Sequence, residues 1–73
     1  MSNNGILVLS NVSEGQKVRL TRLSRGLRQI DVASMANVNT IDVTRLEKDR
    51  SLLPTRRKRI LTVLGLDDDD ESD

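Results

Sequence analysis

The segment from residue 29 to residue 46, QIDVASMANVNTIDVTRL, restricts what this 73-residue chain can fold into more than any other stretch. Its small and apolar residues recur at the three- or four-residue spacing that places side chains on one face of a helix. The first face holds Val32, Ala33 and Ala36, and the second holds Val43 and Leu46. The pattern predicts two short helices, the second running from about Thr40 to Lys48.

The three residues between these helices, Asn37, Val38 and Asn39, leave room only for a sharp turn. Asparagine is one of the few residues besides glycine that tolerate a positive φ, which suits Asn37, and it is also a good N-cap, which suits Asn39. Val38 can fill the angle between the helices, and the small side chain of Ala33 lets their backbones approach. We therefore expect the two helices to pack against each other as one unit.

The chain lacks the residues on which many enzymes and metal sites depend. It contains no cysteine and no histidine, so it has no disulfide framework, no cysteine-based zinc site and no histidine for acid–base work. Its length suits one small domain, and no stretch reads as a membrane span or a secretory signal. These observations predict a cytoplasmic protein that is not an enzyme, binds no cofactor or metal, and does not associate with a membrane.

Charge is distributed unevenly along the chain. The formal net charge is +1, but six of the eleven acidic residues lie within residues 67–73, which leaves residues 1–66 with twelve basic and five acidic side chains. A basic body suits a polyanion. Because the chain contains no Phe, Tyr or Trp, it lacks the aromatic platforms on which proteins stack single-stranded bases. Double-stranded DNA is therefore the expected partner.

Residues 1–12 are expected to form an N-terminal arm with one apolar run, Ile6, Leu7, Val8 and Leu9. Glycine before the run and Ser-Asn after it are the bounds of a short β-strand. A lone strand leaves its backbone groups unpaired. The run would therefore either pair with the same segment of a second copy, forming a dimer, or pack on the helical core as an extended arm.

Residues 13–66 are expected to form the domain itself. The sequence Ser13-Glu14-Gly15-Gln16 has the form of a capping box, and a first helix would run from it to about Arg25. A last helix would run from Pro54, a residue favoured at the first helical position, to about Leu64. The expected fold class is all-α.

Beyond these patterns, the chain resembles the Xre-like family of phage repressor and Cro proteins over roughly residues 15 to 66. Besides the two short helices, the resemblance rests on the R-x-x-x-G-L-x-Q of Arg22, Gly26, Leu27 and Gln29 and on the apolar-Glu pair Leu46-Glu47. It implies a compact four- to five-helix lambda-repressor-like domain in which residues 29–46 form a helix-turn-helix. It also implies an ion pair between Arg22 and Glu47, whose alternative is two ordinary surface charges. Asp49 stands where the family often has glycine, in a turn conformation that aspartate adopts at some cost.

The outward face of the second short helix carries the residues expected to read DNA bases, Thr40, Ile41, Thr44 and Arg45. Ile41 has no solvation reason to lie exposed at a helix start, and a thymine methyl in the major groove would give it one. Arg45 can donate to guanine O6 and N7 with both arms of its guanidinium. The alternatives are that Ile41 packs against a neighbouring helix and that Arg45 is a solvated charge or a phosphate contact. By resemblance, Thr44 reads a base or a phosphate.

The resemblance also makes Gln29 a phosphate ligand that braces the start of this helix. Other candidate phosphate contacts are Arg28, Asn39, Lys48, Arg50, Arg56 and Arg57. The last two belong to a basic run, residues 56–59, at the start of the last helix, where positive charge opposes the helix dipole and argues for a nearby anion. The alternative is a solvated run whose arginine stems cover apolar surface.

Residues 67–73 form an acidic tail without an apolar anchor, which predicts disorder. The tail would keep the protein soluble, compete with DNA for the basic face, or dock on a basic protein partner.

Together these features predict a sequence-specific duplex-DNA-binding transcriptional regulator, a repressor or Cro-like protein of phage or bacterial type. It would act in the cytoplasm of a bacterial or phage-infected cell, as a homodimer on a palindromic operator with half-sites about 34 to 36 Å apart. Two rival functions remain. One is an antitoxin-like protein-interaction module, whose binding segment would be the tail or residues 6–9, and the other is a recombination directionality factor that bends DNA.

Overall fold

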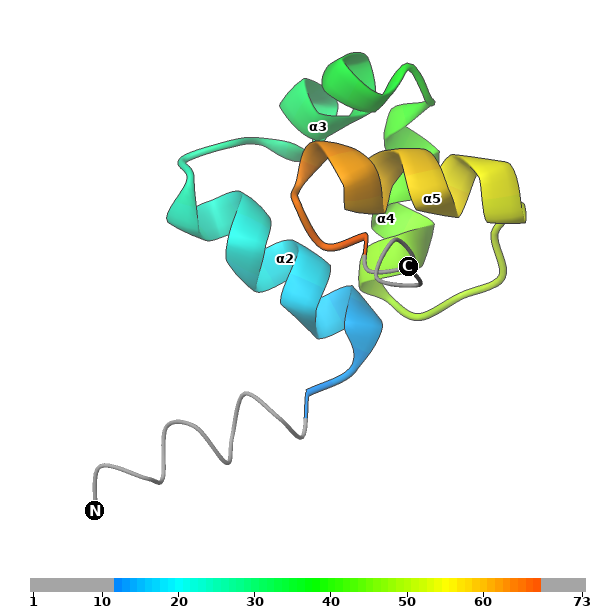
Figure 1. The fold of residues 1–73 in the computed structure, drawn as a ribbon, viewed down its shortest axis with the longest axis horizontal. Coiled ribbons are helices and arrows are strands. Elements are labelled where there is room, and N and C mark those ends of the chain that lie inside the picture. The colour runs from blue at the N-terminus through cyan, green and yellow to red at the C-terminus, as the bar shows by residue number, and fades with distance from the viewer. Residues whose placement is uncertain (1–11, 68–73) are drawn as a thin grey trace, which may run out of the picture.

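The computed structural model describes residues 12–67, and this part of the chain is built from four α-helices without a strand. The helices are α2 (Glu14–Ser24), α3 (Gln29–Ala36), α4 (Thr40–Glu47) and α5 (Pro54–Val63) (Figure 1). The predicted all-α class is confirmed for these residues. Three helices end one residue earlier than predicted, because Arg25, Lys48 and Leu64 are C-caps. The predicted strand at residues 6–9 and the acidic residues 68–73 lie outside the described part of the chain.

The first turn of α2 is closed by the predicted capping box. The Gln16 backbone N–H donates to Ser13 Oγ at 3.1 Å, and the Ser13 N–H donates to Gln16 Oε1 at 2.9 Å. These bonds give partners to two N–H groups at the start of the helix. Beyond the C-cap, Gly26 takes the left-handed conformation with φ 68°, which ends the helix.

The predicted tight turn joins α3 to α4. Asn37 adopts the left-handed conformation with φ 58°, and the half-buried Val38 donates its N–H to the Ala33 carbonyl at 3.0 Å. Asn39 is the N-cap of α4 as predicted, but its side chain makes no capping hydrogen bond. Instead, the backbone N–H of Asn39 donates to the Asp42 carboxylate at 3.0 Å.

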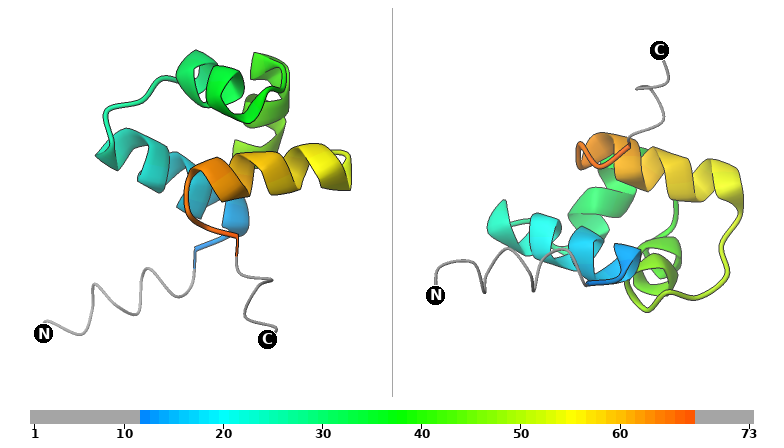
Figure 2. Two further views of the ribbon diagram at one scale, coloured as in Figure 1. Left: turned by 45° about the horizontal axis from the view of Figure 1, so that its top comes forward. Right: turned by 60° about the horizontal axis from the view of Figure 1, so that its bottom comes forward.

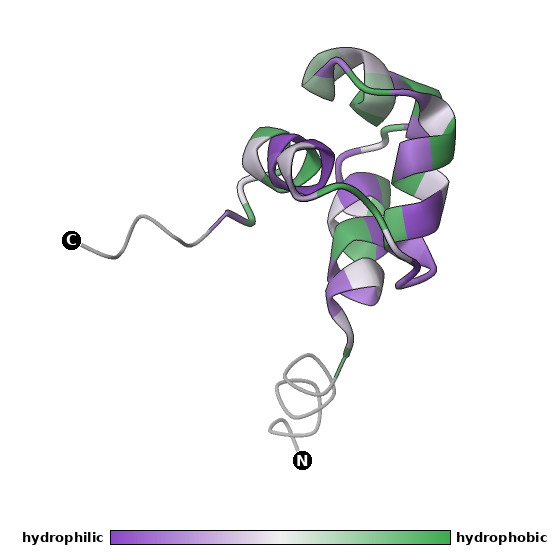
Figure 3. Cartoon of the chain, turned by 90° about the vertical axis from the view of Figure 1, so that its right-hand side faces the viewer, coloured by the Kyte–Doolittle hydropathy of each residue, from purple (hydrophilic) through white to green (hydrophobic). Residues whose placement is uncertain are grey.

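The core lies where the four helices meet. α5 lies across α4 and packs against α3, while α2 packs against α4 (Figures 1 and 2). Hydrophobic and hydrophilic residues share every helix in Figure 3, as expected of helices with one buried face. The buried apolar residues include all five that the pattern of residues 29–46 predicted, together with Val18, Ile60, Leu61 and Leu64.

Candidate nucleic-acid interface

α4 has a buried face and an exposed face. Val43 and Leu46 on the inner face retain 0% and 4% of their accessible surface. On the outer face, Ile41 is 57% exposed, and Thr40 and Arg45 are exposed as well. Ile41 is therefore not packed against a neighbouring helix within residues 12–67. Because Ile41 and Arg45 are four residues apart, α4 presents an apolar side chain and a cation next to each other.

A shallow hollow of about 190 Å³ on this side is lined by Ile41, Thr44, Arg45, Lys48 and Arg50, which we call the α4 face. Its lining contains no acidic residue, and within residues 12–67 none of its three cations forms an ion pair. The surface thus combines unneutralised positive charge with an exposed aliphatic side chain. Such a surface suits a polyanion that also displays apolar groups.

A buried ion pair supports α4 from behind. Arg22 Nε donates to Glu47 Oε2 at 2.6 Å, and Arg22 Nη2 donates to Glu47 Oε1 at 3.1 Å. The two side chains are only 9% and 5% exposed, and Arg22 Nη1 also donates to the Leu27 carbonyl at 3.0 Å. The predicted pair is therefore present, and the alternative of two surface charges is wrong. Two parallel bonds fix the geometry of the pair, so α2 holds the C-terminal end of α4 in one orientation.

Gln29 extends this network to the outer part of α4. Its Nε2 donates to Glu47 Oε1 at 3.0 Å, and its Oε1 accepts the Thr44 hydroxyl at 2.8 Å. The sequence predicted that Gln29 braces the start of α4. The structure corrects this, because Thr44 and Glu47 lie in the middle and at the end of the helix. Gln29 and Thr44, predicted as DNA contacts, are both half-buried and bonded to each other.

Arg28, another predicted phosphate contact, is exposed but forms an ion pair with Asp31 of the same helix start. Its Nη2 donates to Asp31 Oδ1 at 2.9 Å, and its backbone N–H donates to Asp31 Oδ2 at 2.7 Å. These hydrogen bonds from Arg28, the side-chain bond most of all, lower the pKa of the Asp31 carboxyl to about 2. The carboxylate in turn caps the start of α3, where negative charge is favoured.

The basic run at the start of α5 also has acidic partners. Arg57 Nη2 lies 2.6 Å from Glu14 Oε2, and Arg56 Nη1 lies 3.5 Å from Asp42 Oδ1. The nearby anion that the sequence predicted for this helix start is therefore supplied by the protein itself, from α2 and α4. Both arginine side chains remain partly exposed, at 47% and 43%, so they can exchange partners.

A close backbone contact fixes the end of α4, and no sequence pattern clearly predicted it. A Cβ at Gly15 would lie 2.7 Å from the Glu47 carbonyl oxygen and closer still to that of Leu46. Asp49 follows α4 with φ 56°, the predicted turn conformation, and its Oδ1 accepts the Gly15 N–H at 2.9 Å. Hydrogen bonds from the Ser13 side chain and the Gly15 N–H lower the pKa of the Asp49 carboxyl. The only signal was a glycine in the first turn of a helix, where helix propensity disfavours it.

Comparisons with known proteins add no assignment to this geometry. No protein-family model, no curated protein and no solved structure matched the chain. Within residues 12–67, no helix is both long enough and apolar enough to cross a bilayer.

Proposed function

We propose that the protein is a sequence-specific duplex-DNA-binding transcriptional regulator in which α3, the turn and α4 act as a lambda-repressor-type helix-turn-helix. One observation supports this most strongly. Ile41 is 57% exposed on the same face as three cations that no carboxylate within residues 12–67 pairs with. An exposed aliphatic residue alone would be ordinary. On the exposed face of α4, among unpaired cations, the side chain of Ile41 is what we expect of a surface that contacts both phosphates and base edges.

In this function α4 enters the major groove, which is about 12 Å wide and admits an α-helix. Ile41 contacts a thymine methyl group. Arg45 donates to guanine O6 and N7, a bidentate contact worth roughly 1–3 kcal/mol of discrimination against other bases. Thr40, at the first position of α4, offers its hydroxyl to a neighbouring base edge.

Affinity comes from phosphate contacts around α4. Lys48 and Arg50 neutralise phosphates and release counterions, so binding weakens steeply as salt is added. Asn39 lies exposed at the opposite end of α4, where it can reach the other strand. Gln29 and Thr44 contribute by holding α4 in orientation, since their side-chain groups already bond to each other and to Glu47.

One copy of α4 contacts only a few base pairs, so the functional unit is a homodimer on two half-sites about 34–36 Å apart. Bound across a promoter, such a dimer would exclude RNA polymerase and repress transcription in a bacterial or phage-infected cell.

The test is selection of bound duplexes from a random pool by the full-length protein. We expect enrichment of one sequence, arranged as an inverted repeat, with binding that falls steeply with salt. The variant Ile41→Ala/Arg45→Ala should lose the enrichment while retaining weak binding to any duplex. A pool without enrichment, together with binding that Lys48→Ala/Arg50→Ala leaves unchanged, would overturn the proposal.

A further inference from the structure

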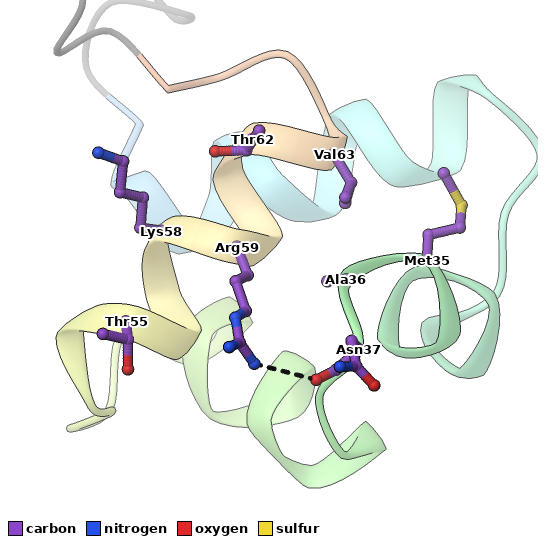
Figure 4. A pocket seen from close by; sticks show the side chains of 8 residues that line it. All are labelled: Met35, Ala36, Asn37, Thr55, Lys58, Arg59, Thr62 and Val63. Carbon is purple, nitrogen blue, oxygen red and sulfur yellow. Dashed lines mark hydrogen bonds between the residues drawn. The ribbon is translucent and has the colours of Figure 1, made fainter.

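A second hollow without acidic lining lies between α3 and α5. This groove of about 550 Å³ is lined by Met35, Ala36, Asn37, Thr55, Lys58, Arg59, Thr62 and Val63, and we call it the α3–α5 groove (Figure 4). Met35 of α3 and Val63 of α5 border it in Figure 4, and Arg59 reaches from α5 toward Asn37. The groove shares no lining residue with the α4 face. The two surfaces can therefore be occupied independently.

The polar residues that α5 contributes to the groove form a stripe of hydrogen-bond donors, Thr55, Lys58, Arg59 and Thr62. Their spacing of three or four residues places them on one side of the helix. Arg59 Nη1 donates to the Asn37 carbonyl at 3.4 Å, a long bond that uses one of five guanidinium donors. Two cations and two hydroxyls from one helix, with no carboxylate among the lining residues, favour an anionic occupant.

The chain after α5 turns back toward this stripe. Gly65 takes the left-handed conformation with φ 73°, and the Leu66 N–H donates to the Leu61 carbonyl at 2.8 Å, which reverses the backbone. The Thr62 hydroxyl then donates to Asp67 Oδ2 at 2.9 Å. The first carboxylate of the acidic tail is therefore already held by the last residue of the stripe.

We propose that residues 68–73 dock in the α3–α5 groove of the same chain, with their carboxylates on Arg59, Lys58 and Thr55. Five of these six residues are acidic, which complements the two cations. Six extended residues span up to about 20 Å. The helix rises only about 10 Å from Thr62 back to Thr55, so the segment is long enough to follow the whole stripe.

The docked tail changes where the protein is positive. It brings negative charge next to Arg59 and Lys58 and leaves the α4 face open, since the two surfaces have no residue in common. The positive potential beside α5 is thereby reduced, while that of the α4 face is unchanged. The tail would direct DNA to α4 and would not compete for it.

The experiment compares NMR spectra of the full-length protein with those of a full-length variant in which all five acidic residues of the segment are neutralised, Asp68→Asn/Asp69→Asn/Asp70→Asn/Glu71→Gln/Asp73→Asn. We expect shift differences in the amides of Thr55 and Arg59 and the methyl groups of Met35 and Val63, but none on the α4 face. The differences should disappear at about 1 M salt, where the screening length falls to about 3 Å. No DNA is present, so the result does not depend on the proposed function.

Charge reversal within the groove supplies the matched control. In a chain that carries Arg59→Glu, neutralising the tail should no longer change the shifts of the groove. In a chain that carries Arg19→Glu, at an exposed cation of α2 outside the groove, neutralising the tail should still change them. Shift differences centred on Ile41 and Arg45 would overturn the proposal, because the tail would then occupy the α4 face. Differences that vanish on dilution would overturn it as well, because the occupant would be the tail of a second copy.

Discussion

The α4 face and the start of α5 carry the same kind of side chain in different surroundings. Each holds a cluster of basic residues, and both clusters were predicted from the sequence to contact DNA. On the α4 face, no cation has an acidic partner within residues 12–67, whereas Arg56 and Arg57 pair with Asp42 and Glu14. Two clusters that look alike in the sequence therefore differ in how much charge they offer to a ligand.

The difference shows that the number of basic residues in a segment does not measure its available charge. The carboxylate that pairs with Arg57 comes from 43 residues earlier in the chain, and the one that pairs with Arg56 comes from 14 residues earlier. Neither lies in the local sequence of the basic run. The fold decides which cations have acidic partners, and within residues 12–67 it leaves those of the α4 face without one.

The largest expected effect comes from removing the ion pair between Arg22 and Glu47, which holds the α4 face in place. Arg22→Met leaves the Glu47 carboxylate, which is 5% exposed, without its charged partner. We expect the free energy of unfolding to fall by about 3–5 kcal/mol, because an unpaired buried charge is strongly destabilising. Urea unfolding followed by circular dichroism measures the change.

A double variant separates the lost partner from lost packing. In Arg22→Met/Glu47→Met no charge is stranded, so part of the lost stability should return. If Arg22→Met alone cost less than about 1 kcal/mol, as the loss of an exposed pair does, the pair would not support α4 as a buried ion pair does.

Removing one arginine from each surface tests whether pairing within the protein lowers an arginine's contribution to DNA binding. Arg45→Ala should weaken binding to the preferred duplex by about 1–3 kcal/mol, roughly 5- to 150-fold, and should weaken binding to random duplex much less. Arg57→Ala, which removes a cation paired with Glu14, should weaken both only slightly. Fluorescence anisotropy with the two duplexes measures these effects. Equal losses for the two variants would mean that intramolecular pairing does not distinguish the surfaces.

The smallest expected effect concerns the pairing of Arg28 with Asp31. The carboxyl pKa is lowered from 3.8 to about 2 in the folded protein, so the pair stabilises the fold above pH 3.8 and this contribution is lost as the pH falls toward 2. Asp31→Asn should therefore make unfolding less sensitive to pH in this window. Urea midpoints of the two proteins at several pH values provide the test. Identical pH profiles would show that the pair contributes nothing.

The helices, the capping box and the turn could be predicted from the sequence, because each depends on residues only a few positions apart. The spacing of Val32, Ala33 and Ala36 was enough to place α3, and Ser13 with Gln16 was enough to place the start of α2. The turn at Asn37 followed from one residue type that tolerates a positive φ. Periodicity, caps and turn residues act locally, so they can be read without knowing the rest of the fold.

What could not be predicted depends on contacts between distant residues. The resemblance supplied the pair between Arg22 and Glu47, but no local pattern indicated that Gln29 would bond to Thr44, or that Arg56 would find Asp42. Many long polar side chains compete for few acceptors, and the packing angle of the helices decides which pairs form. Side-chain roles at the candidate site were therefore less predictable than the helices that carry them.

The backbone contact at Gly15 has a practical meaning for anyone who modifies this protein. Because Gly15 at the start of α2 touches the end of α4 and bonds to Asp49, a group attached at Ser13 would lie close to the segment that carries Lys48 and Arg50. A dye, affinity tag or fused domain joined there through a short linker would be carried next to the surface that we propose binds DNA. A long linker at the amino end, or attachment elsewhere, would keep such cargo from interfering with measurements on DNA.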